Sequence, residues 1–421
     1  MTTKGSAAGP LFAGALAVLA LVGPLSGEGR ADGEKAARIL WRRVLPSSSS
    51  NPRLAASESA VFVTTRHDVS VLDPATGKLR GVFAPPAADV SAAAVVSGNL
   101  AVVSAGEVVY GLTRAGRERW RHALGGATSA TSRAPIVGDD GTVYATSVSG
   151  EVVALEAATG AERWRVALGA DDAGVPPAPV AVTHDLLVLW ARPRTGEAHG
   201  IVALGLGAAR GRHRFTARPG QGLTSLVALD DLGVVSTSYA EASSGRGGSL
   251  IVAHDPEGHE RWRIARGRLE QVLAAAPGRL VGTSQDAAGA FGSSLLELWS
   301  REGRPEATVA LGERVAAATC GADGRVYAVT CGEEGSTLVQ LGPGLAVEAR
   351  IALGRGCHTA LAIDRRGRLL AVGESAQSHA TEGRVAVTEV IALQTVSVAP
   401  PVTRSRSQRS SALASGPGRS R

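Results

Sequence analysis

Residues 133–169, RAPIVGDDGTVYATSVSGEVVALEAATGAERWRVALG, form the most informative stretch of this 421-residue chain. The stretch divides into four short strand-like runs, separated by turns that contain glycine, at 133–137, 142–147, 151–156 and 163–168. Its Asp-Gly and Thr-Gly pairs supply the positive φ that tight hairpins need. Four antiparallel strands within about forty residues are typical of one blade of a β-propeller.

The same pattern recurs along the chain. A glycine stands four positions before tryptophan at Gly116/Trp120, Gly160/Trp164 and Gly258/Trp262. Successive units close on a glycine, and three of the intervals between these glycines are 44, 45 and 42 residues (Gly125 to Gly169, Gly267 to Gly312, Gly312 to Gly354). Such intervals match the length of a four-stranded propeller repeat.

The turn before Trp164 points to a family. The run ALEAATGAERW, residues 154–164, resembles the tryptophan-docking motif of the pyrroloquinoline-quinone (PQQ)-like repeat family, whose usual pattern is Ala-x-Asp-x-x-Thr-Gly-x-x-x-Trp. Glu156 replaces the usual Asp, and residues 73–77 form a similar turn with Gly81 where tryptophan would stand. The resemblance implies that an outer-strand indole lies across each blade junction. We assign this docking role to four residues, Trp41, Trp120, Trp164 and Trp262.

Repeat counting predicts an all-β, eight-bladed propeller with four-stranded antiparallel blades. The expected units are 54–83, 90–126, 132–170, 177–220, 224–267, 270–312, 314–354 and 357–396. The last unit has only three plausible strands, and residues 39–45 look like an outer strand without a sheet. We therefore expect this N-terminal strand to close the ring, which removes an unpaired edge. A count of seven stays open, because the repeat is weak across 177–267.

The ends of the chain have different compositions from the body. Residues 1–31 resemble a signal peptide, with Lys4, an apolar run at Leu11–Leu25 and small residues before Asp32. That run is shorter than the ~20 residues a transmembrane helix needs. We expect a closing strand and linker at 32–52, the propeller at 53–396 and a disordered Arg/Ser/Pro-rich tail at 397–421. The mature protein is thus expected to be periplasmic or extracellular, without a membrane span.

The net charge of +6 resides at the ends of the chain. The tail alone holds five arginines and no acidic residue, so the body is close to neutral. Nucleic-acid-binding domains carry positive charge on the folded surface, and we therefore expect no nucleic-acid partner. The simplest expectation for the mature chain is a monomer.

Three cysteines occur late in the chain, and export permits disulfides. Cys331 is expected to end the second strand of its blade, and Cys357 to begin the first strand of the next blade. These strand ends lie on the same face of a propeller, so Cys331–Cys357 is the predicted inter-blade disulfide. Cys320 is expected to lie at the opposite end of its hairpin and to stay free.

No arrangement of residues amounts to a catalytic, cofactor or metal site. The quinoprotein enzymes of the resembling family use an adjacent Cys-Cys pair, and no two cysteines are adjacent here. His254, Asp255, His259 and Glu260 flank one turn, but the third ligand of a zinc site is missing, so we interpret them as a polar hairpin turn. We predict no enzyme activity, no cofactor and no metal.

Three functions are therefore compared. A scaffold that binds another envelope or extracellular protein is favoured, with the loops 192–199, 241–249 and 284–293 as candidate contacts. The alternatives are a quinoprotein-like oxidoreductase or other propeller enzyme, and a carbohydrate or cell-wall binder. The sequence shows no carboxylate cluster that would support an enzyme. It also offers few surface aromatic residues for binding carbohydrate, since the aromatic content is 4%.

Overall fold

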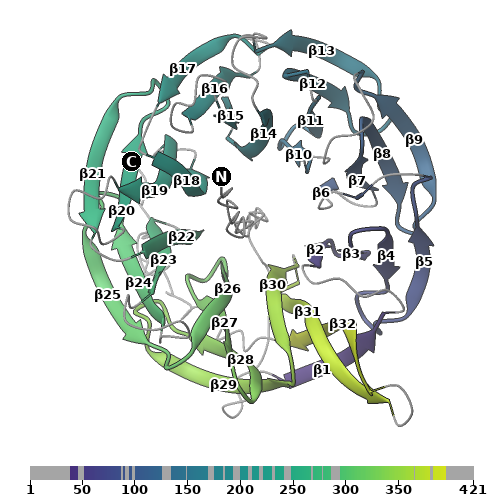
Figure 1. Cartoon of the computed structure of the whole chain (residues 1–421), viewed down its shortest axis with the longest axis vertical. Coiled ribbons are helices and arrows are strands. Elements are labelled where there is room, and N and C mark those ends of the chain that lie inside the picture. The colour runs from purple at the N-terminus through teal and green to yellow at the C-terminus, as the bar shows by residue number, and fades with distance from the viewer. Residues whose placement is uncertain are drawn as a thin grey trace, which may run out of the picture.

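The computed structural model describes residues 38–45, 52–86, 89–90, 94–96, 100–125, 134–147, 149–168, 175–183, 185–192, 200–206, 211–217, 221–229, 233–240, 248–266, 269–276, 278–285, 294–364, 366–379 and 383–394. Every named element in these residues is a β-strand. The strands form eight antiparallel four-stranded sheets arranged in a ring (Figure 1). The structure thus confirms the eight-bladed propeller and excludes seven blades.

The first four blades follow one another along the chain, each running from its inner to its outer strand. Blade 1 consists of β2 (Arg53–Ala56), β3 (Val61–Thr64), β4 (Val69–Leu72) and β5 (Leu79–Phe83). Blade 2 consists of β6 (Ala94–Val96), β7 (Leu100–Ala105), β8 (Val108–Thr113) and β9 (Glu118–Ala123). Blade 3 consists of β10 (Ile136–Val137), β11 (Thr142–Thr146), β12 (Glu151–Glu156) and β13 (Glu162–Ala167). Blade 4 consists of β14 (Val175–Val182), β15 (Leu186–Arg192), β16 (Gly200–Gly205) and β17 (His213–Ala217).

The next three blades repeat this order. Blade 5 consists of β18 (Gln221–Leu229), β19 (Gly233–Ala240), β20 (Gly248–His254) and β21 (Glu260–Arg266). Blade 6 consists of β22 (Leu269–Ala276), β23 (Arg279–Gln285), β24 (Ser294–Ser300) and β25 (Pro305–Ala310). Blade 7 consists of β26 (Arg314–Cys320), β27 (Val326–Gly332), β28 (Gly335–Leu341) and β29 (Val347–Gly354).

Blade 8 combines the two ends of the described chain. Its inner three strands are β30 (Cys357–Ile363), β31 (Arg368–His379) and β32 (Gly383–Gln394), and its outer strand is β1 (Arg38–Val44). β1 pairs antiparallel with β32, so that Trp41 stands opposite Ala392. In Figure 1 the purple β1 lies beside the yellow β32, as expected for a ring closed by the N-terminal strand.

The hydrophobic core lies between the blades. Middle strands such as β3 and β4 are buried along their whole length, because a neighbouring blade covers each face of the sheet. One core cluster joins Val102 and Trp120 of blade 2 to Val143 and Leu155 of blade 3. Burial alternates along the outer strands instead, as in β25, where exposed residues separate half-buried ones. The Val-rich runs of the sequence therefore become the central strands of each sheet.

Strand directions give the ring two faces. The turns between third and fourth strands, such as 73–78, lie on one face, which we call the glycine-turn face. The connections between blades, such as 355–356, lie on the opposite face, which we call the linker face. The second and third strands of blades 4, 5 and 6 meet at the linker face. The candidate loops that join them lie almost wholly outside the described residues.

The first strand of blade 3 was expected at 133–137, but β10 spans only Ile136–Val137, since Pro135 has no N–H to donate to a strand ladder. The expected signal peptide at 1–31 and tail at 397–421 lie outside the described residues. No helix in the described part of the chain is long and apolar enough to cross a membrane.

Candidate functional site

Trp120 shows how the outer strands hold neighbouring blades together. β9, β13 and β21 all begin with Glu-Arg-Trp-Arg. The Trp120 indole N–H donates to the carbonyl of Ala157 in blade 3 at 2.8 Å, and the side chain is buried. Its ring lies against Gly160, whose φ is +71° and where a Cβ would collide with the indole. The indole of one blade thus covers the glycine turn of the next.

The same contact recurs at two further junctions. Trp262 of blade 5 donates to the carbonyl of Arg301 in blade 6 at 2.6 Å and lies against Gly303. Trp164 of blade 3 lies against Gly211 of blade 4, where a Cβ would be 2.8 Å from the ring. Each receiving glycine has a positive φ, which L side chains rarely adopt. The turn therefore supplies both a tight bend and room for the ring.

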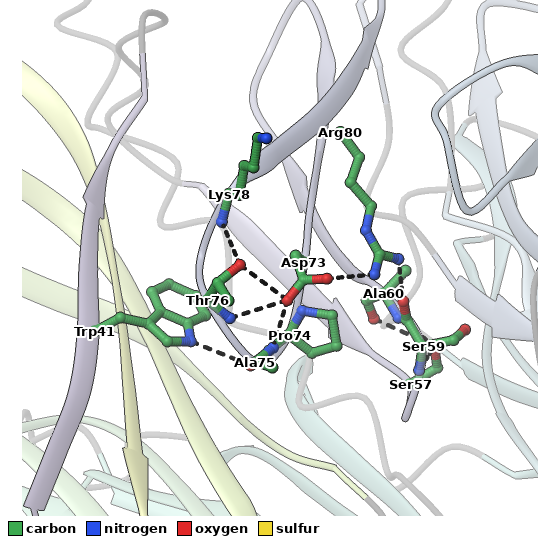
Figure 2. Close-up of polar contacts among 10 residues, drawn as sticks. All are labelled: Trp41, Ser57, Ser59, Ala60, Asp73, Pro74, Ala75, Thr76, Lys78 and Arg80. Carbon is green, nitrogen blue, oxygen red and sulfur yellow. Dashed lines mark hydrogen bonds and ion pairs between the residues drawn. The ribbon is translucent and has the colours of Figure 1, made fainter.

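Trp41 makes this contact at the closure of the ring, between blade 8 and blade 1 (Figure 2). Its indole N–H donates to the carbonyl of Pro74 at 3.1 Å, and its ring lies against Gly77. The turn is held by Asp73, whose Oδ1 accepts hydrogen bonds from the N–H groups of Ala75 and Thr76, each at 2.9 Å. The structure thus places all four predicted tryptophans at blade junctions.

Asp73 is a strongly stabilised carboxylate. Burial alone would raise its pKa, but the hydrogen bonds from Arg80, Thr76 and Ala75 outweigh that effect and lower the pKa to about 2. Arg80 donates to Asp73 Oδ2 at 2.5 Å and to the carbonyl of Ser59. The turn that receives Trp41 is thus tied to the neighbouring Ser57–Ala60 turn of the same blade.

Phe215 is a fifth docking residue that the sequence analysis missed. It lies on β17 of blade 4, and a Cβ at Gly258 of blade 5 would collide with its ring. Gly211 stands four positions before Phe215, the same spacing as Gly160 before Trp164. Searching for glycine followed by any aromatic residue, instead of tryptophan alone, would have found this junction.

Each junction is filled by one large side chain, which comes from either the outer strand of the blade or the third strand beside it. The residue paired with a docking aromatic is always small, namely Gly111, Ala154, Ala203, Ala253 or Ala392. Where the outer strand instead carries Gly81, Ala307 or Ala349, the paired residue is Val71, Leu298 or Gln340. Packing at native density permits one bulky group per position, which explains this exchange of sizes.

The junction between blades 7 and 8 is held covalently. The structure joins Cys331 of β27 to Cys357 of β30, with their Cα atoms 5.5 Å apart. Cys320 is free and half-buried, and its partial burial raises the pKa of its thiol to about 12. At that pKa the thiol stays protonated and unreactive at neutral pH. The structure thus brings together the two cysteines that we expected to pair.

A buried polar group lies beside the disulfide. Ser336 Oγ is 2.6 Å from His358 Nδ1, and His358 Nε2 is 3.7 Å from Glu389 Oε2. Burial, together with the charge of Arg42, lowers the pKa of His358 to about 4. Burial raises the pKa of Glu389, and Arg42 at 3.5 Å opposes this shift.

Ser336, His358 and Glu389 link neighbouring strands, and we call this group the buried clasp. His358 is 0% exposed and Ser336 3%, so no substrate can reach the serine hydroxyl. The residues come from β28, β30 and β32, which belong to blades 7 and 8. Sequence analysis missed the group because its members are separated by 22 and 31 positions without a spacing motif.

The histidines near residue 255 do not form a metal centre. His254 is buried and stacks on Phe215, with ring centroids 6.4 Å apart. His259 is exposed, and its Nδ1 lies 3.2 Å from Asp255 Oδ2. No group of three His, Cys, Asp or Glu residues suited to a metal occurs in the part of the chain that the structure describes. Asp255 instead accepts hydrogen bonds from the N–H groups of its own turn.

Comparison with known proteins places the repeat in a family. The sequence profile described as outer membrane protein assembly factor BamB matches residues 30–243, half of the chain. The chain belongs to the BamB family. The match runs from before β1 to just past β19, so it includes Trp41, Trp120 and Trp164. None of the curated protein sequences matches this chain.

Solved structures show the BamB-like fold in several proteins. BamB from Moraxella catarrhalis is 16% identical, with a TM-score of 0.56 over 86% of this chain and 98% of that protein. The computationally designed Ika8 protein is 15% identical, with a TM-score of 0.58 over 84% of this chain and 98% of the design. Quinohemoprotein alcohol dehydrogenase ADHIIG from Pseudomonas putida HK5 is 12% identical, with a TM-score of 0.55 over 87% of this chain and 78% of the enzyme.

The fold is thus shared by an assembly factor and by an oxidoreductase, and function must be argued from the residues of the site. The resemblance to quinoproteins implies an adjacent Cys-Cys pair against the quinone. The disulfide here joins cysteines 26 residues apart, at the linker face, so these residues do not fit that role.

Proposed function

We propose that this protein is an exported propeller scaffold that binds another protein of the cell envelope or the extracellular space. The observation that carries the proposal is the BamB family match, since the family is described as an outer membrane protein assembly factor. The distinctive side chains of the described residues also support it. The docking aromatics, the disulfide and the buried clasp all hold blades together, which leaves the two faces and the rim for recognition.

The linker face is the first candidate contact surface. Tyr239, near the end of β19 in blade 5, is 42% exposed and is the only aromatic among the exposed large hydrophobic residues of the described chain. The loops 192–199, 241–249 and 284–293 adjoin strands of blades 4, 5 and 6 that end at this same face. Exposed tyrosines are frequent anchors of protein interfaces because they bury a large area at low entropic cost.

Cross-linking in the native host tests this function. The tagged full chain, expressed with its own leader, is cross-linked and purified, and bound proteins are identified by mass spectrometry against a leader-deleted control. We expect one envelope protein to be captured reproducibly, and capture to weaken in Tyr239→Ser but not in Arg304→Ser, a control on the glycine-turn face. Capture of the same proteins by the leader-deleted control would contradict an exported scaffold.

A further inference from the structure

The junction between blades 1 and 2 is built differently from its neighbours. β5 carries Gly81 at the position where β9, β13 and β21 carry tryptophan. The Gly81 backbone packs directly on the turn of blade 2, where a Cβ would overlap the carbonyl oxygen of Ala115. At this point the two blades therefore meet backbone to backbone, and no indole covers the turn of blade 2. Farther along β5, Phe83 contacts Tyr110 of blade 2, with ring centroids 5.2 Å apart.

An open pocket of about 550 Å³ lies beside this contact. It is lined by residues from the third–fourth strand turns of both blades and from the start of β5, namely Asp73, Thr76, Lys78, Leu79, Arg80, Arg114 and Ala115. Three of these side chains are cationic and one is acidic. The pocket therefore carries a net positive charge.

The single carboxylate of the pocket is already satisfied. Figure 2 shows Asp73 bonded to Arg80 and to the N–H groups of its own turn. Lys78 takes part only through its backbone, since its N–H donates to Thr76 and its carbonyl accepts from the Asp73 N–H. Lys78 and Arg114 are exposed, and neither side chain has an ion pair within the described parts of the chain. Two cations at the pocket are therefore available to an external anion.

The edge of β5 is also less protected than the edges of blades 2, 3 and 5. The outer strands of blades 2, 3 and 5 each carry a Glu–Arg ion pair, with distances of 2.7 Å for Glu118–Arg121, 2.8 Å for Glu162–Arg165 and 2.6 Å for Glu260–Arg263. Charged side chains on an edge strand discourage the addition of another strand. β5 reads LRGVF, contains no acidic residue and exposes Val82 by 45%.

We propose that β5 and the adjoining pocket form a docking surface for an extended acidic segment of a partner protein. The segment adds to the free edge of blade 1 as a further strand and places a carboxylate between Lys78 and Arg114. Main-chain hydrogen bonds supply affinity in such strand addition, and the charged pocket supplies specificity. The chain's own tail, with five arginines and no acidic residue, has the wrong charge to occupy this surface.

A short fluorescein-labelled peptide of alternating glutamate and valine tests the surface by fluorescence anisotropy with the full chain. We expect saturable binding that weakens at least about tenfold in Lys78→Glu/Arg114→Glu. Arg212→Glu/Arg214→Glu, which makes the same charge change in blade 4, should bind like the unmodified protein. The proposal would be overturned if Lys78→Glu/Arg114→Glu bound the peptide as tightly as the unmodified protein does. It would also be overturned if a peptide with alternate N-methylated amides bound as tightly as the original peptide.

This inference rests on the proposed scaffold function, and a second measurement separates the two. Lys78→Glu/Arg114→Glu is cross-linked in the native host beside the unmodified chain. Loss of a partner whose cross-linked segment is acidic would support the docking surface. Undiminished capture of every partner would contradict the docking surface but leave the scaffold function standing. Both substituted residues are exposed, so an unchanged thermal unfolding curve verifies that the variant is folded.

Discussion

At the scale of the residue, each of the five junctions with a docking aromatic depends on one ring and one glycine. Trp120 combines a large apolar surface with an N–H that reaches the carbonyl of Ala157, so the ring is buried without an unsatisfied donor. Gly160 provides the φ of +71° and the space for the ring. The Gly-x-x-x-Trp spacing therefore predicted these positions from sequence, because turn and ring are both local features of the chain.

Removal of the Trp120 ring should cost about 3–5 kcal/mol in the free energy of unfolding, since it empties a buried junction. The matched control is Arg119→Ala on the same strand, where an exposed side chain should matter by no more than about 0.5 kcal/mol. Urea unfolding of both variants measures the difference. Equal stabilities would contradict the docking role of Trp120.

Blade 6 suggests how the stability lost on removal of the Trp120 ring could be restored. There Leu298 faces Ala307, the reverse of Gly111 facing Trp120. We therefore expect Gly111→Leu alone to be destabilising, because a Cβ at Gly111 already collides with the indole. In Trp120→Ala the same change should restore part of the lost stability, as a double-mutant cycle would measure. Additive losses would mean that the paired strands do not share one packing volume.

At the scale of the element, blade 8 differs from the others because its outer strand comes from the opposite end of the chain. Its junction with blade 7 has Ala349 at the docking position of β29 and relies on the disulfide and the buried clasp instead. The disulfide followed from strand order, which the repeat predicted. Ser336, His358 and Glu389 could not be predicted, because only the packing of separate strands brings them together.

Loss of the disulfide should cost about 3 kcal/mol, the range expected for a loop of this length. Cys331→Ser/Cys357→Ser should unfold at lower urea concentration than the oxidised protein and should not respond to reductant. Cys320→Ser keeps the bridge and should respond to reductant like the unmodified chain. Non-reduced peptide mass spectrometry that finds Cys320 in the bridge would refute the pairing.

Acid should weaken the same junction through His358. Burial holds its folded-state pKa at about 4, below the value of about 6.5 in the unfolded chain. Between these values the unfolded state binds the proton more readily, so stability falls as pH decreases from about 6.5 to 4. The raised pKa of Glu389 acts in the opposite direction.

Comparison of variants isolates the histidine. His358→Gln should show a smaller loss of stability across this pH range, whereas His259→Gln, which changes an exposed histidine, should retain the full loss. Urea unfolding between pH 4 and 7 makes the measurement. Equal pH profiles for the two variants would exclude His358 as the source of the acid sensitivity.

At the scale of the whole molecule, the repeat period determined most of what could be predicted. Blade number, strand order and closure by β1 follow from local turns and from the need to bury both faces of each sheet. The recognition surfaces do not follow from the period. The pocket beside Gly81 forms where two turns from different blades meet, and its exposed cations stay available because Asp73 is bonded to Arg80. Such features become visible only when neighbouring blades are packed against each other.

The claim that this ring is an exported protein-binding scaffold is tested most directly by site-specific photo-cross-linking in the native host. A photoreactive residue is placed at Tyr239 on the linker face, at Val82 on the edge of β5, and at Arg304 on the glycine-turn face as a control. We expect adducts with an envelope or extracellular protein from the first two positions and none from the third. Absence of adducts from both Tyr239 and Val82, in folded and exported protein, would contradict the scaffold function.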